Sequence, residues 1–370
     1  MLKNRATAEA TAAYAGRFKI LPSHFRPMFG LTGSSIGVGT YLGNENEEAD
    51  RGYEEAIKAA LLGGINVIDT AVNYRFQRSE RAVGRAISEL VATGQVKREE
   101  IIVATKGGYI TFDGGVPADP RAYFEDAYIK TGIIGPGELV EGSHCMAPRY
   151  LETMLEMSRA NLGLETIDIY YLHNPEAQLP AVGREEFNRR IRRAFEFLEA
   201  SVREGKIGAY GTATWNGFRS DPRSKDYLSL QDLVRIATEV GGSEHHFKII
   251  QLPYNLAMPE ALTHSNQALA DAQGTILDAA RRMGVAVWAS ASLLQGRLAG
   301  NLPAVVAEAM EGMSTDAQRS IQFARSTPGI DVALVGMKSV AHVRENLETA
   351  KRAPAPIEAF TKLFKPESNR

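Results

Sequence analysis

Cysteine is nearly absent from this sequence of 370 residues, because Cys145 is its single thiol. One thiol cannot form a disulfide within the chain, so the fold must be stabilised by packing alone, as is usual in a reducing compartment. Long apolar runs are also absent. Met1–Phe18 holds no block suited to a secretory signal, and no run reaches the roughly 20 residues that cross a bilayer. We therefore expect a cytoplasmic protein without a membrane-spanning segment.

Neither sign of charge is in excess. The 42 Lys and Arg residues nearly balance the 44 Asp and Glu residues, which leaves a net charge of −2. Without a basic run, no surface is marked for a nucleic-acid backbone or an anionic membrane. Spacings typical of metal ligands are missing too, so we interpret His144-Cys145 and His245-His246 as surface residues and predict no metal.

Short β-branched runs alternate with amphipathic helical stretches, a pattern typical of a parallel sheet. The predicted strands are Ser35–Thr40, Asn66–Ala71, Ile101–Lys106, Ile167–His173, Ile207–Thr214, Lys248–Leu252, Val285–Ser290 and Asp331–Gly336. The predicted helices are Tyr53–Leu62, Ser79–Leu90, Arg149–Leu162, Glu185–Glu204, Leu230–Val240, Ala268–Met283, Thr315–Ser326 and Val340–Lys351. Because no linker interrupts the series, we predict a single (β/α)8 TIM barrel over residues 1–370, with a short N-terminal extension to about residue 25.

A long irregular loop, Gly107–Pro148, follows the third predicted strand. It must start at the barrel end where active sites lie, because it leaves the carboxyl end of a strand. Its aromatic residues are too many for a solvated connector: Tyr109, Phe112, Tyr123, Phe124 and Tyr128. We predict that part of the loop folds over a substrate pocket. The alternative is that these rings pack against a second subunit, so a homo-oligomer stays open.

Four polar residues fall at or just beyond the ends of apolar strands, where side chains of a barrel converge. They are Asp69, Tyr74, Lys106 and His173. A neighbouring ammonium stabilises a phenolate, so we expect Lys106 to lower the pKa of Tyr74 and Asp69 to hold Lys106 protonated. His173 is suited to a hydrogen bond with the substrate oxygen. The alternative for each residue is a structural role, such as an ion pair between Asp69 and Lys106.

Several motifs together resemble the aldo-keto reductase family from about Phe29 to Lys351. They are the segment 64–71 followed by Tyr74 and Ser79-Glu80, the strands ending in Lys106 and His173, then 204–207, Gly211, Gln251, Tyr254-Asn255, and Gly336 with Glu345-Asn346. The resemblance implies a barrel of the aldo-keto reductase type with a nicotinamide cofactor extended across its mouth. It also implies a catalytic tetrad of Asp69, Tyr74, Lys106 and His173.

The resemblance extends to the residues around the cofactor and the substrate. The implied cofactor-binding residues are Gly39, Thr40, Asp69, Thr214, Gln251, Ser290, Leu293, Gly336, Lys338, His342 and Asn346, and the implied substrate residues are Tyr41, Tyr109 and Trp215. Lys338 at a helix start favours NADP(H) over NAD(H). The chain departs from the family where Ala213-Thr214 replaces a Ser-Asn pair and where Ser290 replaces a stacking aromatic. We expect Trp288 to pack outward.

These features predict an NAD(P)H-dependent oxidoreductase, an aldo-keto reductase or alcohol dehydrogenase. It would transfer a hydride between the cofactor and a carbonyl or alcohol, such as an aldehyde, a ketone or a sugar-like compound, with Tyr74 as general acid and base. The alternative is a cofactor-binding regulatory or sensor protein on the same fold. A glycosidase is disfavoured, because it needs two facing carboxylates and only Asp69 ends a strand motif.

Overall fold

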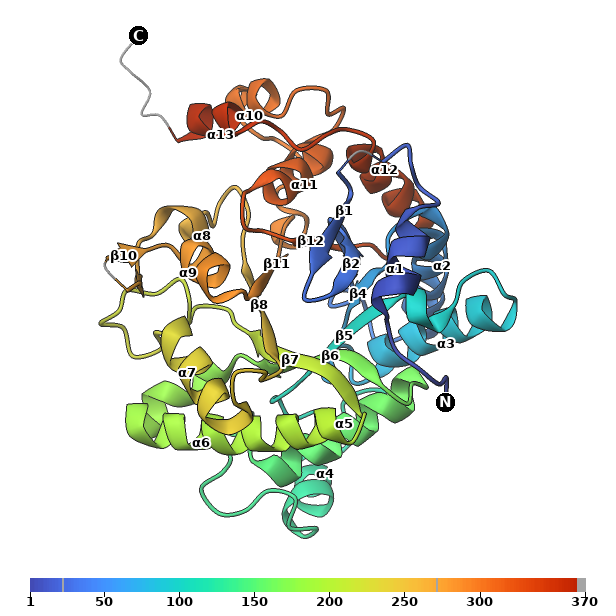
Figure 1. Cartoon of the computed structure of the whole chain (residues 1–370). Helices are drawn as coiled ribbons and strands as arrows, with labels where there is room; N and C mark the ends of the chain where they lie inside the picture. The colour runs from blue at the N-terminus through green and yellow to red at the C-terminus, as the bar shows by residue number, and fades with distance from the viewer. Residues whose placement is uncertain (22, 271, 365–370) are drawn as a thin grey trace.

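The computed structural model describes residues 1–21, 23–270 and 272–364. In this part of the chain, eight parallel strands close into a barrel, in the order β3, β4, β5, β6, β7, β8, β11 and β12 (Figure 1). Their bounds are β3 Ile36–Gly39, β4 Val67–Asp69, β5 Ile102–Gly107, β6 Ile167–His173, β7 Ile207–Ala213, β8 Phe247–Pro253, β11 Ala286–Ser290 and β12 Val332–Gly336. The predicted (β/α)8 architecture and all eight predicted strands are confirmed.

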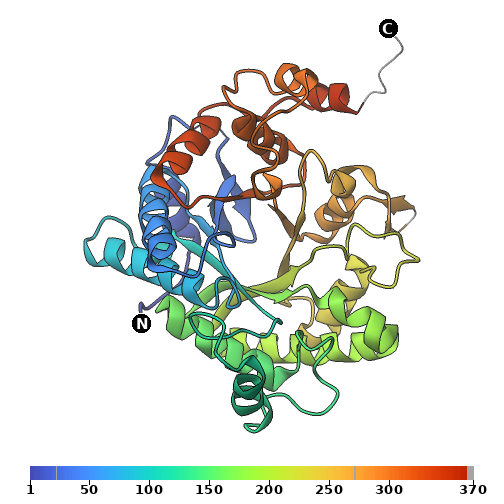
Figure 2. The same cartoon turned by 180° about the vertical axis from the view of Figure 1, so that it is seen from behind.

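Helices surround the barrel on its outer face (Figures 1 and 2). The α-helices are α1 Ala8–Ala15, α2 Glu47–Gly63, α3 Arg78–Ala92, α4 Pro120–Phe124, α5 Pro148–Leu162, α6 Leu179–Arg203, α7 Leu230–Gly241, α8 Glu260–Thr263, α9 Ile276–Met283, α10 Ala304–Ala309, α11 Asp316–Ser326, α12 Val340–Ala350 and α13 Ile357–Leu363. Shorter helical turns are η1 Arg98–Glu100, the π-helix η2 Glu125–Ile129, η3 Pro175–Gln178 and η4 Leu294–Gly296. Among these helices, none is long and apolar enough to cross a bilayer.

Local signals in the sequence explain where the helices begin and end. The Asn46 side chain accepts a hydrogen bond from the Ala49 amide at the start of α2, where acidic residues also suit the positive end of the helix dipole. α2 is capped at its end by Gly64, whose φ of 108° is left-handed. The predicted boundary furthest from the structure is the start of α9, because Ala268 belongs to the short β9–β10 hairpin (Gln267–Ala268 and Gln273–Gly274) and α9 starts only at Ile276.

The amino-terminal end of the barrel is closed by the hairpin of β1 (Phe25–Met28) and β2 (Leu31–Ser34), onto which Figure 1 looks. The Asn66 side chain, just before β4, bonds to this hairpin through Ser34 and Thr32. The segment before the hairpin is also held to the barrel. The buried Asp168 carboxylate accepts the amides of Ala6 at 2.7 Å and Val103 at 2.8 Å.

Two layers of apolar side chains form the core. The larger layer lies between the strands and the surrounding helices, and the smaller one fills the barrel interior. Trp288 is fully buried in the smaller layer, where its ring contacts Tyr171. The prediction that it packs outward is wrong, because residues two apart on a strand share a face, so Trp288 faces the same way as Ser290.

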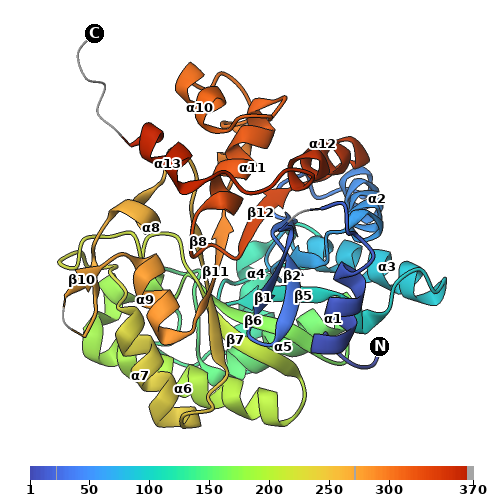
Figure 3. The same cartoon turned by 45° about the horizontal axis from the view of Figure 1, so that its top comes forward.

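The long loop after β5 forms a small cluster of its own. α4 and η2 lie beside α5 at the edge of the molecule in Figure 1, and Tyr128 packs against Tyr150 with ring centroids 5.9 Å apart. At the other side, α13 lies beside α10 near the C-terminus (Figure 3). Most of the loop therefore packs sideways against the barrel instead of covering its mouth.

Candidate active site

A cavity of about 760 Å³ opens at the carboxyl ends of the barrel strands. Its walls include every predicted site residue except Lys106: Gly39, Thr40, Tyr41, Asp69, Tyr74, Tyr109, His173, Thr214, Trp215, Gln251, Ser290, Leu293, Gly336, Lys338, His342 and Asn346. The volume suits a ligand of the size of an organic cofactor or substrate. The structure thus brings residues from across the whole sequence to one pocket.

Below the pocket lies a buried ion pair. The ammonium of Lys106 donates to Asp69 Oδ2 at 2.6 Å and to the carbonyl of Thr70 at 2.8 Å. The other carboxylate oxygen of Asp69 accepts from Gln251 Nε2 at 2.8 Å. Burial raises the pKa of the Asp69 carboxyl and lowers the pKa of the Lys106 ammonium, while each charge favours the ionised form of the other. Lys106 is therefore placed behind Asp69, outside the cavity wall.

Tyr74 lines the pocket in the loop between β4 and α3. The Lys106 ammonium lies 4.9 Å from the centre of its ring. The expected lowering of the Tyr74 pKa is not found, because burial and the nearby Asp69 carboxylate raise this pKa well above its ordinary value. The phenol consequently keeps its proton at neutral pH and is suited to donate it.

The backbone after Tyr74 forms a left-handed turn without glycine. Arg75, Phe76 and Gln77 have φ angles of 49°, 52° and 72°. Each such residue in this region of φ costs about 1–3 kcal/mol. Side-chain bonds oppose this cost: Arg75 is buried and binds the Asp50 carboxylate and the carbonyl of Asn44. The turn thereby connects the segment of Tyr74 to the loop that follows β3.

His173 ends β6, and its ring faces the pocket. Its ring centre lies 5.8 Å from that of Tyr74 and 5.1 Å from that of Tyr109, both nearly perpendicular. Burial and the charge of Lys106 lower the pKa of His173 well below its ordinary value. The imidazole is neutral at neutral pH, so it can donate or accept one hydrogen bond to a ligand atom.

The opposite end of the pocket lies at the start of α12. Lys338 is exposed on the pocket wall, two residues before this helix begins, and no ion pair within the described residues engages its ammonium. The free amides of a helix start and a cation together suit a phosphate group. A long pocket with a proton donor at one end and this arrangement at the other fits a dinucleotide.

The sequence departures at Ala213 and Ser290 also lie on the pocket wall. Thr214 follows Ala213, and its hydroxyl donates a hydrogen bond to the carbonyl of Gln251 at 3.2 Å. Both side chains at 213 and 290 are small, so this part of the wall offers little stacking surface. Exposed aromatic rings stand nearby at the mouth, where Tyr41 is 55% and Trp215 is 43% exposed.

Two residues at or near the pocket wall were not predicted from the sequence. Asn174 lies on the pocket wall, and its amide donates to the Tyr109 hydroxyl at 3.2 Å. Glu176 is buried, and its Oε1 accepts the backbone amides of Trp215 and Asn216 at 2.6 and 3.1 Å. The signal for both is their place within three residues after His173, at the mouth side of a strand end. Glu176 thus fixes the segment that carries Trp215.

Comparisons with known proteins agree with this geometry. Residues 35–302 match the model of the Aldo/keto reductase family. The protein named Aldo-keto reductase YhdN from Bacillus subtilis is 41% identical over 193 residues, 50% of this chain and 45% of that protein. The protein named Uncharacterized oxidoreductase YqkF from the same organism is 27% identical over 326 residues, 86% of this chain and 87% of that protein.

The chain spans about half the length of several curated relatives that it matches. A solved structure of an aldo/keto reductase from Klebsiella pneumoniae in complex with NADP and acetate has a similar fold. It shows a TM-score of 0.61 and 21% identity, and the match covers 90% of this chain and 91% of that chain. Because the family model covers well over half of the residues, the chain belongs to the aldo-keto reductase family.

Proposed function

We propose that the protein is an NADP(H)-dependent oxidoreductase that interconverts a carbonyl compound and its alcohol. The observation that carries the proposal is the convergence of the protonated Tyr74 and the neutral His173 on one wall of the pocket, with the buried Lys106–Asp69 pair beneath them. This is the arrangement needed to protonate an oxygen in a pocket of low polarity.

The pocket residues fit a nicotinamide dinucleotide. Gly336, Lys338 and His342 would hold its phosphate end, and Thr214, Gln251 and Ser290 would lie beside its nicotinamide end. When bound, the cofactor supplies or takes up the hydride. The free cation of Lys338 favours the cofactor form with the additional phosphate, and the similar structure from Klebsiella pneumoniae holds NADP.

The chain's own residues supply the proton and the orientation of the substrate. In the reducing direction Tyr74 gives its hydroxyl proton to the carbonyl oxygen, while the carbonyl carbon gains the hydride, so that an alcohol forms. His173 donates one hydrogen bond to the same oxygen and fixes its position. Lys106 acts through Asp69 and through the Tyr74 ring, so it is a positioning residue.

The substrate end of the pocket favours an uncharged compound. Tyr41, Tyr109 and Trp215 give it aromatic walls, and Asn174 adds an amide. His173 is neutral, and Lys338 lies at the far end. A small aldehyde, a ketone or a sugar-like carbonyl matches these walls, because the cation beside Tyr74, Lys106, is buried and already paired with Asp69, so an anionic substrate would gain no counter-charge there.

The test combines cofactor binding with turnover. Purified protein is titrated with NADPH and NADH while the cofactor fluorescence is followed, and oxidation of the bound form is then measured with a panel of neutral aldehydes, ketones and reducing sugars. We expect tighter binding of NADPH, and turnover that the Tyr74→Phe variant loses while it still binds the cofactor. Binding without turnover of any substrate would instead indicate a sensor or regulatory protein, and an active Tyr74→Phe variant would refute the role of the phenol.

A further inference from the structure

His144 is a buried residue of the long loop that follows β5, although the sequence suggested a surface histidine. It is 2% exposed, and both of its ring nitrogens have partners. Its Nε2 lies 2.7 Å from the backbone oxygen of His173, and its Nδ1 lies 3.1 Å from Gln178 Nε2. The loop therefore reaches the residue that ends β6 from behind the pocket wall.

Arg190 and the His173 carbonyl determine which atom donates in each hydrogen bond that links them through Gln178 and His144. Arg190 can only donate, so the Gln178 oxygen accepts from it at 2.9 Å and the Gln178 amide group faces His144. The carbonyl of His173 can only accept, so His144 carries its proton on Nε2. Burial lowers the pKa of His144 to about 4, which leaves Nδ1 free to accept from Gln178.

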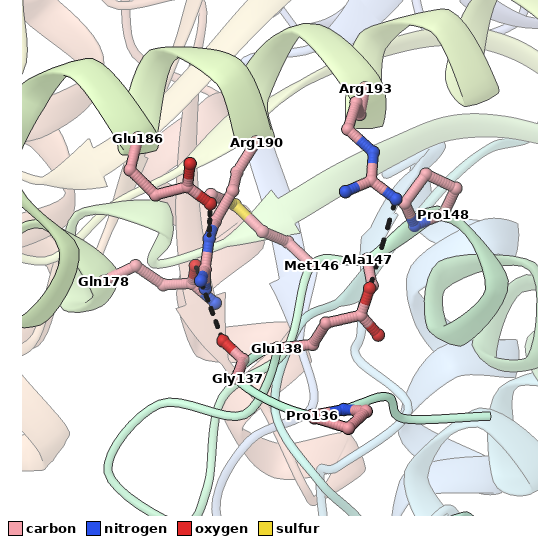
Figure 4. A pocket seen from close by; sticks show the side chains of 10 residues that line it. All are labelled: Pro136, Gly137, Glu138, Met146, Ala147, Pro148, Gln178, Glu186, Arg190 and Arg193. Carbon is pink, nitrogen blue, oxygen red and sulfur yellow. Dashed lines mark hydrogen bonds and ion pairs between the residues drawn. The ribbon is translucent and has the colours of Figure 1, made fainter. Parts of the chain in front are cut away.

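Arg190, the outermost of these hydrogen-bonded residues, lines a small surface pocket of about 180 Å³ (Figure 4). Figure 4 shows the Arg190 guanidinium between Glu186, Gln178 and the carbonyl of Gly137. Arg190 is thus held by α6 and by the long loop together. A polar path of four residues, Arg190, Gln178, His144 and His173, leads from this surface to the active-site wall.

His144 also packs against Tyr109, whose ring contacts His173. Tyr109 stands perpendicular to His144 at 5.0 Å and to His173 at 5.1 Å, between the two histidines. The His173 ring itself is held by packing, because its Nδ1 has no hydrogen-bond partner among the described residues. Its orientation hence depends on Tyr109 and on the backbone that His144 holds.

Gly108 lies directly against the hydrogen bond between His144 and the His173 carbonyl. Its φ is +149°, and a Cβ there would lie 2.9 Å from both His144 Nε2 and the His173 oxygen. Those two atoms form the hydrogen bond itself, so a side chain at position 108 would push them apart. Only glycine leaves room for His144 to approach the end of β6.

From this geometry we infer that His144 is a positioning residue for the reaction, which holds His173 and Tyr109 in place and is itself held by Gln178 and Arg190. The inference rests on the proposed function, since it assigns His144 an effect on carbonyl reduction. It makes the long loop a part of the catalytic framework, through contacts behind the pocket.

The experiment compares His144→Leu, which removes both ring bonds, with His144→Gln, whose amide can still donate to the His173 oxygen. A displacement of a reacting group by about 1 Å can cost about 100-fold in rate, so we expect kcat of His144→Leu to fall by about 10- to 100-fold. NADPH affinity stays unchanged, and His144→Gln regains most of the rate. His245→Leu is the matched control, because His245 lies before β8 at the other end of the barrel.

A second measurement reads His173 directly. The sequence has seven histidines, so nuclear magnetic resonance of protein labelled with 15N-histidine can resolve the His173 ring. We expect its signals to shift in His144→Leu and, to a smaller degree, in Arg190→Met at the surface, with kcat of the latter reduced about twofold or more. The signals stay in place in His245→Leu.

The outcomes separate this inference from the proposed function. Wild-type kcat and unmoved His173 signals in His144→Leu would overturn the positioning role while the reductase assignment stands. Absence of turnover in the wild type, with shifted His173 signals in the variant, would refute the proposed function and leave only the structural contact. Because Arg190 lies at the rim of the surface pocket, Arg190→Met keeps the test decisive if His144→Leu does not fold.

Discussion

Replacing Asp69 by Asn is expected to destabilise the protein strongly, because it removes the counter-charge of a buried lysine. The side chains of Asp69 and Lys106 are 6% and 1% exposed. Breaking such a buried pair costs about 3–5 kcal/mol. The cost has a ceiling, since Lys106 can lose its proton instead. Deprotonating a lysine of ordinary pKa 10.5 at pH 7 takes about 5 kcal/mol.

This free energy converts into a measurable shift of Tm. With an unfolding entropy of about 2.1 cal/mol/K per residue, a chain of this length loses about 4–6 °C for 3–5 kcal/mol. The penalty also depends on pH. With Lys106 neutral in the folded variant, the unfolded chain binds one more proton below pH 10.5, so the stability of Asp69→Asn rises with pH. At pH 9 the penalty should be about 2 kcal/mol.

The assay is thermal and urea unfolding of Asp69→Asn, Lys106→Met and the double variant, followed by circular dichroism at pH 7 and pH 9. The double variant leaves no unpaired charge, so it should lose less stability than the sum of the two single variants. Single-variant effects that add to within about 0.5 kcal/mol would refute the ion-pair reasoning. So would a penalty for Asp69→Asn that is the same at both pH values.

Three further predictions follow from buried groups. The free energy of unfolding should fall as pH drops from 7 to 5, by about 2 kcal/mol for each of His24 and His144. Burial lowers the pKa of these two histidines in the folded protein to about 3 and about 4, so the unfolded chain takes up protons first. Equal urea midpoints at the two pH values would contradict this. Because the pKa of Tyr74 is raised, kcat for reduction should stay constant from about pH 6 to 9, while the rate of alcohol oxidation increases with pH. A reduction rate that falls in that interval would show that the pKa of the phenol is lowered instead. Glu176→Ala leaves backbone amides of the Trp215 segment without their acceptor, which costs about 1–3 kcal/mol, so substrate KM should rise about tenfold. Glu176→Gln keeps an acceptor oxygen and is the control. A normal KM in Glu176→Ala would refute the role of Glu176.

Periodicity and strand-end polarity predicted the parts of the fold that follow local rules. Each barrel strand is a short apolar run, and its last residues share one end of the barrel, so the sequence alone places Asp69 and His173 together. The remaining wall residues came from the resemblance to a family.

The errors lie where a side chain's partners come from distant segments. His144 resembles a surface histidine in sequence, because nothing local shows that Gln178 and the backbone of His173 will meet its ring. The predicted direction of the Tyr74 pKa is wrong because the sequence does not show how deeply distant segments bury the phenol, and burial raises this pKa. The hairpin before α9 has a helical apolar pattern, and only the capping box of Thr275 and Asp278 marks the true start of that helix.

The left-handed turn after Tyr74 has a consequence for any attempt to make this protein more heat-resistant. Glycine is the residue that tolerates such φ angles, so at any of these positions it would relieve about 1–3 kcal/mol of backbone strain. At position 75 the same exchange would delete the guanidinium that joins Asp50 and the loop after β3 to the Tyr74 segment. Breaking a buried ion pair costs about 3–5 kcal/mol, which exceeds the strain that glycine would relieve, so libraries for heat resistance should keep Arg75.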